Sequence, residues 1–151
     1  MATPVADRAV LDTNVLLAAT DEGRDEHEGA VACLNIWPRS GCVLYTSGQI
    51  MREYLAVATR PAAQNGLGMA RSAAIANVRA LRTRLHLLAE DEKVSDRLLE
   101  LLDAVECTGK QVLDANVVAT MLVHGIDTLV TSNVGDFAMF AERVHVVGLC
   151  P

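Results

Sequence analysis

The chain has 151 residues and a net charge of −6, and 51% of its residues are apolar. These values suit one domain with a sizeable core, and because aromatic residues make up only 3%, we expect a core of Ala, Val, Leu, Ile and Met. No apolar run reaches the ~18 residues of a membrane helix, and the first residues lack the basic start and apolar stretch of a secretory signal. We therefore expect a single domain over residues 1–151 that stays in the cytoplasm, away from membranes.

Short apolar segments alternate with longer segments of helical periodicity along the whole chain. In chain order, the pattern predicts a strand at 8–11, a helix at 13–20, a helix that includes 30–37, a strand at 42–46, a helix from 48 to about 59, a helix from about 67 to 84, a strand at 85–88, helices at 92–105 and 114–124, and strands at 128–131 and 144–147. Ser47 is a predicted helix cap, and Pro38, Pro61 and Gly125 are predicted to end helices.

This alternation is typical of the α/β class, in which helices cover a sheet on both faces. We predict a central, mostly parallel sheet of about four or five strands. In open sheets of this kind, ligands bind beyond the carboxyl ends of the strands. The polar residues that follow the predicted strands are therefore the first candidates for a functional site.

Two of the predicted strands end in polar side chains that can carry chemistry. Asp12 follows the first strand, and Thr131, Ser132 and Asn133 end the fourth, with Asp136 close behind. If the strands are parallel, these groups lie at the same edge of the sheet. Each acid also has an ordinary interpretation, because Asp12 can cap the next helix and Asp136 can be a loop acid.

Two further acids belong to predicted helices. Glu53 stands at the edge of an apolar stripe, and a half-buried carboxylate there needs a positive partner. That partner is either a nearby arginine or a metal ion. Asp114 precedes a segment suited to the interior, and its ordinary role is an N-cap that contributes roughly 1 kcal/mol.

If these acids converge in the fold, they create a site for a hard divalent cation. Mg²⁺ and Mn²⁺ prefer carboxylate oxygens, and Mg²⁺ often keeps several waters while one or two carboxylates bind it. Three or four acids gathered without such an ion would repel one another. A bound cation can lower the pKa of a water molecule, orient it, and offset the charge that builds on a phosphodiester.

The charges are unevenly distributed, with one basic segment in an acidic chain. Residues 52–84 carry six arginines and only one acid, whereas residues 1–30 and 85–151 are acidic. Arginine suits bidentate contacts with phosphate, so this segment is a candidate for binding nucleic acid, and the alternative is a solvated helix surface. The candidate contacts are Arg71, Arg79, Arg82 and Arg84.

Four motifs resemble those of PIN-domain ribonucleases. They are VLDTNVLL at residues 10–17, REY at 52–54, LDANVVA at 113–119, and LVTSN at 129–133 followed by Asp136 and Phe137. All four occur in the order of that family, and together they cover nearly the whole chain. The size of the chain and the absence of an added domain resemble the VapC-type toxins of bacterial toxin–antitoxin pairs.

The resemblance implies an endoribonuclease that depends on Mg²⁺ or Mn²⁺ and acts on structured RNA. By position, it implies a metal-binding triad of Asp12, Glu53 and Asp114. The fourth contributor is Asp136 or the Asn133 position. Many relatives carry an acid where Asn133 stands, so the fourth ligand and a second metal ion stay open.

The resemblance also implies supporting residues and partners. Asn14 and Thr131 would be polar supports that orient ligands or water. Relatives of this kind are usually homodimers and are held inactive by a cognate VapB-type antitoxin, whose tail often lies over the acidic site.

Three other functions fit parts of the sequence. One is an RNA-processing nuclease that is not a toxin, and another is a domain that binds partners without catalysis. The third is a phosphatase or a phosphoacceptor receiver, which also places an Asp after the first strand. A phosphatase, however, has a second Asp two residues after the first, where this chain has Asn14. A receiver has a Lys at the end of a later strand, whereas here Thr131 ends the strand and Ser132 follows it.

Other common chemistries have no supporting motif. No glycine-rich phosphate loop follows a predicted strand, and the four histidines are scattered. We interpret His124, near a predicted helix end, as a capping or dipole contact. Because the cysteines lack zinc or disulfide spacing, we interpret them as reduced and mostly buried; they are Cys33, Cys42, Cys107 and Cys150.

Overall fold

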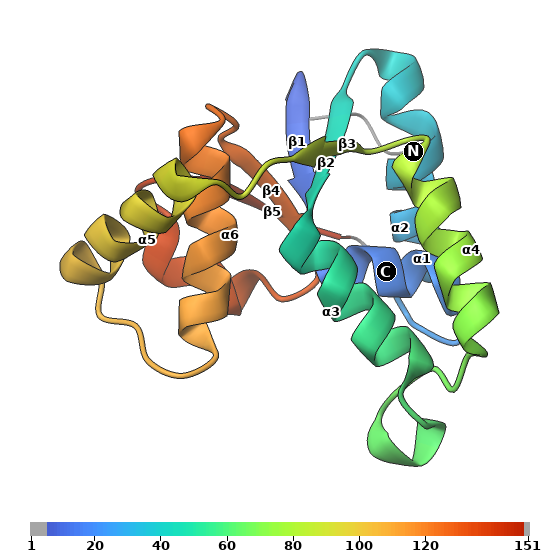
Figure 1. Cartoon of the computed structure of the whole chain (residues 1–151). Coiled ribbons are helices and arrows are strands. Elements are labelled where there is room, and N and C mark those ends of the chain that lie inside the picture. Colours follow the sequence, from blue (N-terminus) through green and yellow to red (C-terminus); the bar gives the residue numbers. More distant parts are fainter. Residues whose placement is uncertain (1–5, 150–151) are drawn as a thin grey trace.

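A five-stranded parallel sheet forms the centre of the structure (Figure 1). The computed structural model describes residues 6–149. The strands are β1 (Arg8–Leu11), β2 (Val43–Ser47), β3 (His86–Leu88), β4 (Thr128–Thr131) and β5 (His145–Gly148). They lie in the order β3-β2-β1-β4-β5, and every neighbouring pair is parallel. The predicted α/β class and sheet are therefore confirmed, and the observed strand ends lie within one residue of their predicted positions.

Helices cover both faces of this sheet. Residues 6–149 form α1 (Thr13–Thr20), α2 (His27–Ile36), α3 (Gly48–Thr59), α4 (Arg71–Arg82), α5 (Glu92–Ala104) and α6 (Gln111–Val123), with the short 3₁₀ segments η1 (Pro38–Ser40), η2 (Ala62–Gln64) and η3 (Val134–Phe140). Figure 1 shows α1 to α4 on one side of the sheet and α5 and α6 on the other. None of these helices combines the length and the apolar character that crossing a bilayer requires.

Local signals explain where several helices begin and end. Ser47 caps α3 as predicted, because its hydroxyl oxygen accepts a hydrogen bond from the backbone N–H of Ile50 at 3.3 Å. Asp12 occupies the N-cap position of α1 and accepts from the N–H of Thr13 at 2.8 Å. Gly125 follows α6 with a φ of 67°, a left-handed conformation that glycine adopts at low cost.

The core contains more aromatic side chains than the composition suggested. The three largest fully buried side chains are those of Tyr54, Phe137 and Phe140, so the expectation of a purely aliphatic core is wrong. Each aromatic ring buries a large apolar area, and three of the five aromatic residues of the chain are fully buried. The hydroxyl of Tyr54 also hydrogen-bonds Thr20 of α1 at 2.8 Å and Asn77 of α4 at 3.3 Å, which ties both helices to α3.

The helix predicted from residue 67 to 84 is shorter, because α4 spans only residues 71–82. Residues 67–70, which precede it, are not helical, and two of them bond back to the end of α3. The backbone N–H of Leu67 donates to the carbonyl of Val57 at 3.1 Å, and that of Met69 donates to the carbonyl of Ala58 at 2.9 Å. These bonds satisfy carbonyls that the end of a helix leaves without partners, and they prevent an earlier start of α4.

The helix that carries Asp114 starts earlier than predicted. α6 begins at Gln111, with Lys110 at the cap position, so Asp114 lies in the first turn and is not the N-cap. The side chain of Gln111 accepts a hydrogen bond from the backbone N–H of Thr108 at 3.1 Å, which starts the helix one turn earlier. The carboxylate of Asp114 is thereby left available for other contacts.

The strand order reverses between β1 and β4. The chain runs from β1 outward through β2 to β3, then returns to the other side of β1 for β4 and β5. Crossovers on opposite faces leave a crevice at the carboxyl ends of the two central strands, which is where ligands bind in such sheets. Asp12 follows β1 and Thr131 ends β4, so the polar residues singled out in the sequence border this crevice.

Candidate functional site

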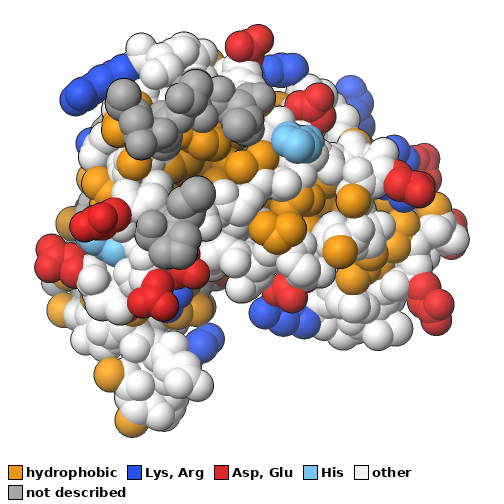
Figure 2. All heavy atoms as spheres, turned by 180° about the vertical axis from the view of Figure 1, so that it is seen from behind, with side chains coloured by type: hydrophobic (Ala, Val, Ile, Leu, Met, Phe, Trp, Pro, Cys, Tyr) orange, Lys and Arg blue, Asp and Glu red, His pale blue; other side chains and the backbone are white. Residues whose placement is uncertain are grey.

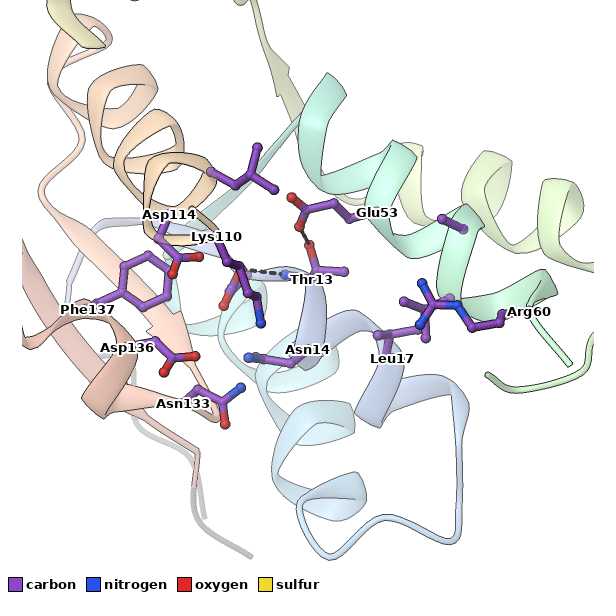
Figure 3. Close-up of a pocket in the computed structure, with 14 residues that line it drawn as sticks. Thr13, Asn14, Leu17, Glu53, Arg60, Lys110, Asp114, Asn133, Asp136 and Phe137 are labelled. Carbon is purple, nitrogen blue, oxygen red and sulfur yellow. Dashed lines mark hydrogen bonds between the residues drawn. The ribbon is translucent and has the colours of Figure 1, made fainter. Parts of the chain in front are cut away.

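An open pocket of about 460 Å³ lies at the ends of β1 and β4 (Figure 3). It is lined by the four acids and the asparagine that the sequence singled out, namely Asp12, Glu53, Asp114, Asp136 and Asn133. In Figure 3, Asp114, Asp136 and Asn133 approach from one side of the pocket, and Glu53 approaches from the other. Residues from α1, α3, α6 and η3 thus meet in one place.

Asp12 is the most buried of these acids, with 8% of its surface exposed. Burial raises its pKa above the ordinary value, whereas hydrogen bonds from the Thr131 hydroxyl and the Thr13 backbone N–H act in the opposite direction. The nearby charges of Glu53 and Asp136 raise the pKa further. A deeply placed carboxylate held by two donors, beside other acids, is a strong attractor for a cation.

Glu53 is held by neutral donors. Its Oε2 accepts a 2.9 Å hydrogen bond from the hydroxyl of Thr13, and its Oε1 accepts a 2.8 Å bond from Nε2 of Gln49. The ion pairs formed within residues 6–149 do not include Glu53, and the neighbouring Arg52 faces Glu90 at 3.8 Å. An arginine partner for Glu53, one of the two predicted options, is therefore not found in the described part of the chain.

Asp114 has a pKa raised from 3.8 to about 6. Burial is the largest cause, followed by the charges of Asp12 and Asp136, while Lys110 lowers the pKa and Glu53 raises it. The three other acids of the pocket thus all disfavour the ionised form of Asp114. Such a cluster is relieved either by protonation or by a bound cation.

The predicted supports Asn14 and Thr131 contact each other and the site. Nδ2 of Asn14 donates to the Thr131 hydroxyl at 3.2 Å, and that hydroxyl donates to Oδ2 of Asp12 at 2.9 Å. The Asn14 side-chain oxygen accepts from the backbone N–H of Ser132 at 3.0 Å, and the Thr131 hydroxyl accepts from the N–H of Asn133 at 3.0 Å. These bonds join the segments that follow β1 and β4, while Asn133 and Asp136 are exposed at the rim.

Several polar residues at the site were not singled out in the sequence. Arg60 and Lys110 line the pocket, and Gln49 and Thr13 hold the carboxylate of Glu53. Helical spacing was an available signal for two of them, because Gln49 lies one turn before Glu53 and Arg60 lies about two turns after it. Lys110 lies beyond a loop whose course the sequence did not define.

The four arginines predicted to bind RNA lie away from this pocket. Arg71, Arg79 and Arg82 are exposed on α4, and Arg84 follows that helix. Arg84 donates a 2.7 Å hydrogen bond to the side-chain oxygen of Asn35 on α2. Their contact with RNA stays a prediction, which concerns a surface outside the acidic pocket.

The donor set of the pocket determines which metal it could hold. Within residues 6–149, no three His, Cys, Asp or Glu side chains converge closely enough to form a metal cage by themselves. The pocket instead presents carboxylate and amide oxygens on several walls, and its volume has room for several waters at about 30 Å³ each. These residues fit an open site for a hard divalent cation that keeps part of its water shell.

Histidines and cysteines are engaged elsewhere. Nδ1 of His27 lies 2.7 Å from the carbonyl of Ala18, and Nε2 of His124, at the end of α6, lies 2.8 Å from the carbonyl of Ala89. The predicted position of His124 at a helix end is confirmed. Burial raises the pKa of the Cys33 thiol to about 12, with a further contribution from Cys42, which makes it a poor nucleophile.

The remaining cysteines do not alter this picture. Cys42 is buried and Cys107 is partly buried, and both are free thiols, as is Cys33. These three agree with the prediction of reduced, mostly buried cysteines. Cys150 lies outside the described residues.

Solved structures share this fold. VapBC2 of Rickettsia felis, solved bound to a DNA fragment from its promoter, is 15% identical with a TM-score of 0.67, covering 95% of this chain and 99% of the other. VapBC-1 of nontypeable Haemophilus influenzae is 16% identical with a TM-score of 0.66, covering 93% and 97%. VapC20 of Mycobacterium tuberculosis, a toxin that cleaves the sarcin-ricin loop, is 21% identical with a TM-score of 0.63, covering 80% and 86%.

Sequence comparison adds a family. No curated protein is similar enough to this chain to count as a match. The profile of the PIN domain, in contrast, matches residues 9–142, a range that contains β2, β3, β4 and all but the first residue of β1, and that ends before β5. It also contains every acid of the pocket. The chain therefore belongs to the PIN domain family.

Proposed function

We propose that this protein is a metal-dependent endoribonuclease and the toxin of a VapBC-type toxin–antitoxin pair. The observation that carries the proposal is the meeting of Asp12, Glu53, Asp114 and Asp136 in one pocket of a PIN domain. PIN domains generally use divalent metal ions. An oxygen-lined pocket with room for water fits such an ion and a phosphodiester together.

In this proposal the acids hold Mg²⁺ or Mn²⁺ together, some as direct ligands and the others through water molecules that the cation keeps. Asp12 is the central ligand because it is the deepest and is kept in place by two hydrogen bonds. Glu53 and Asp114 approach from α3 and α6, and Asp136 or Asn133 completes the set at the rim. When bound, the cation lowers the pKa of a water molecule and offsets charge on the phosphodiester.

The basic residues near the acids support a nucleic-acid substrate. Lys110 and Arg60 line the same pocket as the acids, so a phosphate at the site can contact a cation just before α6 or just after α3. The exposed arginines of α4 are a second set of cations, which lies outside the pocket. A substrate with several phosphates, such as RNA, can use both sets of cations, whereas a small phosphate ester can use only the first.

The proposed partners are a VapB-type antitoxin and a second copy of the chain. The structures from Rickettsia felis and Haemophilus influenzae that share the fold are VapBC complexes. Figure 2 shows apolar side chains gathered in the middle of one face of this protein, with charged side chains around them. An apolar surface gathered on one face suits association with other chains.

The main alternative is a PIN-domain nuclease that processes RNA without being a toxin. Both alternatives use the same pocket, so a cleavage assay does not distinguish them. The effect of the protein on bacterial growth does. A phosphatase or receiver is less well supported. Both amide atoms of Asn14, which stands where a phosphatase has its second Asp, are bonded to Thr131 and Ser132.

A cleavage assay tests the nuclease proposal. Purified protein is incubated with total RNA in Mg²⁺, in Mn²⁺ or in chelator, and we expect cleavage only with a divalent cation. Asp12→Asn and Asp114→Asn should abolish cleavage while circular dichroism shows an intact fold. Asp96→Asn is the matched control, because Asp96 is an exposed aspartate of α5 outside the pocket. Retained cleavage in either pocket variant would contradict the assignment of the site.

A growth assay tests the toxin proposal. Expression of the chain alone in a bacterial host should stop growth, and co-expression of the gene beside it should restore growth. The Asp12→Asn variant should be harmless without the second gene. Normal growth with the active enzyme expressed alone would favour the RNA-processing alternative.

A further inference from the structure

A line of hydrogen bonds connects Glu53 to Glu90 through Gln49 and Asn116. Both polar atoms of the Gln49 side-chain amide take part in it. Nε2 of Gln49 donates to Oε1 of Glu53 at 2.8 Å and to the backbone carbonyl of Leu113 at 2.9 Å. Oε1 of Gln49 accepts a 2.7 Å bond from Nδ2 of Asn116. Gln49 is only 7% exposed, so these bonds are made largely out of water and a wrong orientation of the amide would be costly.

The line ends at a second carboxylate, that of Glu90. Nδ2 of Asn116 also donates to Oε1 of Glu90 at 2.9 Å, and Oε2 of Glu90 accepts from the backbone N–H of Gln49 at 2.8 Å. An ionised carboxylate can only accept hydrogen bonds. Glu90 therefore requires the nitrogen of Asn116 to face it, and that nitrogen in turn requires the oxygen of Gln49.

These requirements give the line a direction. With its oxygen turned toward Asn116, Gln49 must present its NH₂ group to Glu53. If the amide of Gln49 were reversed, its oxygen would face the carboxylate of Glu53, and two acceptors would repel each other. The orientation of a donor that touches Glu53 is thus determined by an acid that does not line the pocket.

The same bonds connect the helices that carry two of the site acids. Gln49 and Glu53 belong to α3, whereas Leu113 and Asn116 flank Asp114 on α6. Figure 1 places these two helices on opposite sides of the sheet. The bonds from Gln49 to Leu113 and Asn116 therefore hold the wall that carries Glu53 at a set position relative to the wall that carries Asp114.

We propose that Gln49, Asn116 and Glu90 are positioning residues that set the affinity of the acidic pocket for a divalent cation. This inference rests on the proposed function, because it concerns the same site. The three residues do not touch the ion. They hold the carboxylate of Glu53 in one orientation, and outer partners of this kind typically change metal affinity by about 10- to 100-fold when they are lost.

The sharpest test reverses the direction of the line without changing its charge. The double variant Glu90→Gln with Asn116→Asp exchanges the acid and the amide, so the net charge and the number of side-chain heavy atoms stay the same. The new carboxylate at position 116 can only accept. If the amide of Gln49 turns round to donate to this carboxylate, Glu53 loses its hydrogen-bond donor. If the amide does not turn, its oxygen faces the carboxylate and Gln49 loses the hydrogen bond from residue 116 that orients it.

The readout is Mn²⁺ binding to the metal-free protein, measured by isothermal titration calorimetry and by the electron paramagnetic resonance of free Mn²⁺. Measurements are made at a temperature at which circular dichroism shows a fully folded chain. We expect Mn²⁺ to bind about tenfold more weakly to the double variant than to the wild type. Gln49→Met, which removes the amide at similar volume, should show a similar loss and serves if the double variant does not fold.

Asn77→Asp is the matched control, because Asn77 is an amide that bonds Tyr54 outside the pocket. It should lower stability and leave Mn²⁺ affinity within about twofold of the wild type. Unchanged Mn²⁺ affinity in the folded double variant or in folded Gln49→Met would overturn the positioning role and leave only a structural one. Failure of the wild type itself to bind Mn²⁺ would overturn the proposed function instead, so the two failures are distinguishable.

Discussion

The hydroxyl of Thr131 donates a 2.9 Å hydrogen bond to Oδ2 of Asp12, although 119 residues separate the two along the chain. The same hydroxyl oxygen accepts from Nδ2 of Asn14 at 3.2 Å and from the backbone N–H of Asn133 at 3.0 Å. Thr131 is fully buried. Thr131, the last residue of β4, therefore holds the most buried acid of the pocket in place. It also joins the segment that follows β1 to the segment that follows β4.

The first prediction concerns this bond. Thr131→Val keeps the shape of the side chain but leaves a buried oxygen of Asp12 without its donor, so we expect the free energy of unfolding to fall by about 1–3 kcal/mol. Urea denaturation measures the loss. Thr131→Ser retains the hydroxyl and should recover most of the stability.

Thr128→Val is the control for that experiment, because Thr128 is a buried threonine at the other end of β4. It should leave RNA cleavage unchanged, whereas Thr131→Val should reduce it. Equal cleavage by the two valine variants would show that Thr131 does not serve the site.

The second prediction is a pH dependence of the metal-free protein. The pKa of Asp114 in the fold is about 6, above its ordinary 3.8, so between these pH values the folded chain retains a proton that the unfolded chain has lost. Stability from this group therefore falls as the pH rises from about 4 to 6, and then stays low.

Asp114→Asn removes this penalty. In chelator at pH 7, we expect its Tm to exceed that of the wild type by about 2–4 °C, the shift that roughly 1 kcal/mol produces in a chain of this size. The difference should close near pH 4. A variant with a lower Tm than the wild type at pH 7 would show that the carboxylate is stabilising even without a cation.

The third prediction concerns the stabilising effect of the cation. A ligand that binds only the folded state at 100 times its Kd contributes about 2.7 kcal/mol, so Mn²⁺ or Mg²⁺ should raise the Tm of the wild type. Differential scanning fluorimetry measures the shift. Asp12→Asn should lose most of it, and Asp96→Asn should keep it. If Asp12→Asn showed the same Tm shift as the wild type, the cation would bind somewhere other than the acidic pocket.

The fourth prediction separates two sets of basic residues. In the Asp12→Asn background, which we expect not to cleave RNA, replacing Arg60 or Lys110 with Gln should weaken RNA binding, because both line the pocket. Replacing Arg71 or Arg79 should also weaken it if α4 touches RNA. The slope of log K against log salt should fall by about 0.7–0.9 for each phosphate contact that is lost.

Arg97→Gln is the control for these measurements. Arg97 lies on α5 and forms an ion pair with Glu100 at 2.9 Å, outside the pocket. Its replacement should leave the salt slope unchanged. If replacing Arg71 and Arg79 has as little effect as this control, the basic segment of α4 is a solvated helix surface.

The fifth prediction concerns the loop that follows Arg60. A Cβ at Gly66 would overlap the backbone carbonyl of Arg60, and backbone cannot move aside as a flexible side chain can. Gly66→Ala should therefore destabilise the protein by about 1–3 kcal/mol in a denaturant titration. Gly135→Ala, where an added Cβ meets open space, should be nearly neutral. A neutral result for Gly66→Ala would show that the loop shifts easily.

The sequence alone identified the sheet and the acids because both follow from local patterns. Short apolar runs predicted the strands to within one residue, and the rule that parallel strands present their carboxyl ends at one edge placed Asp12 beside Thr131. Glu53 was predicted to stand at the edge of a helical stripe, and it lines the pocket. Such patterns record only how a residue relates to its neighbours along the chain.

Only the tertiary structure decided the partners of these acids. The prediction offered an arginine or a metal ion for Glu53, but the contacts that form are with Thr13 and Gln49. Gln49 in turn depends on Asn116 and Glu90, which lie 67 and 41 residues away. Hydrogen bonds of this kind require atoms to be placed within about 3 Å and correctly oriented, and that placement comes from how the helices pack on the sheet, which no periodicity along the chain records.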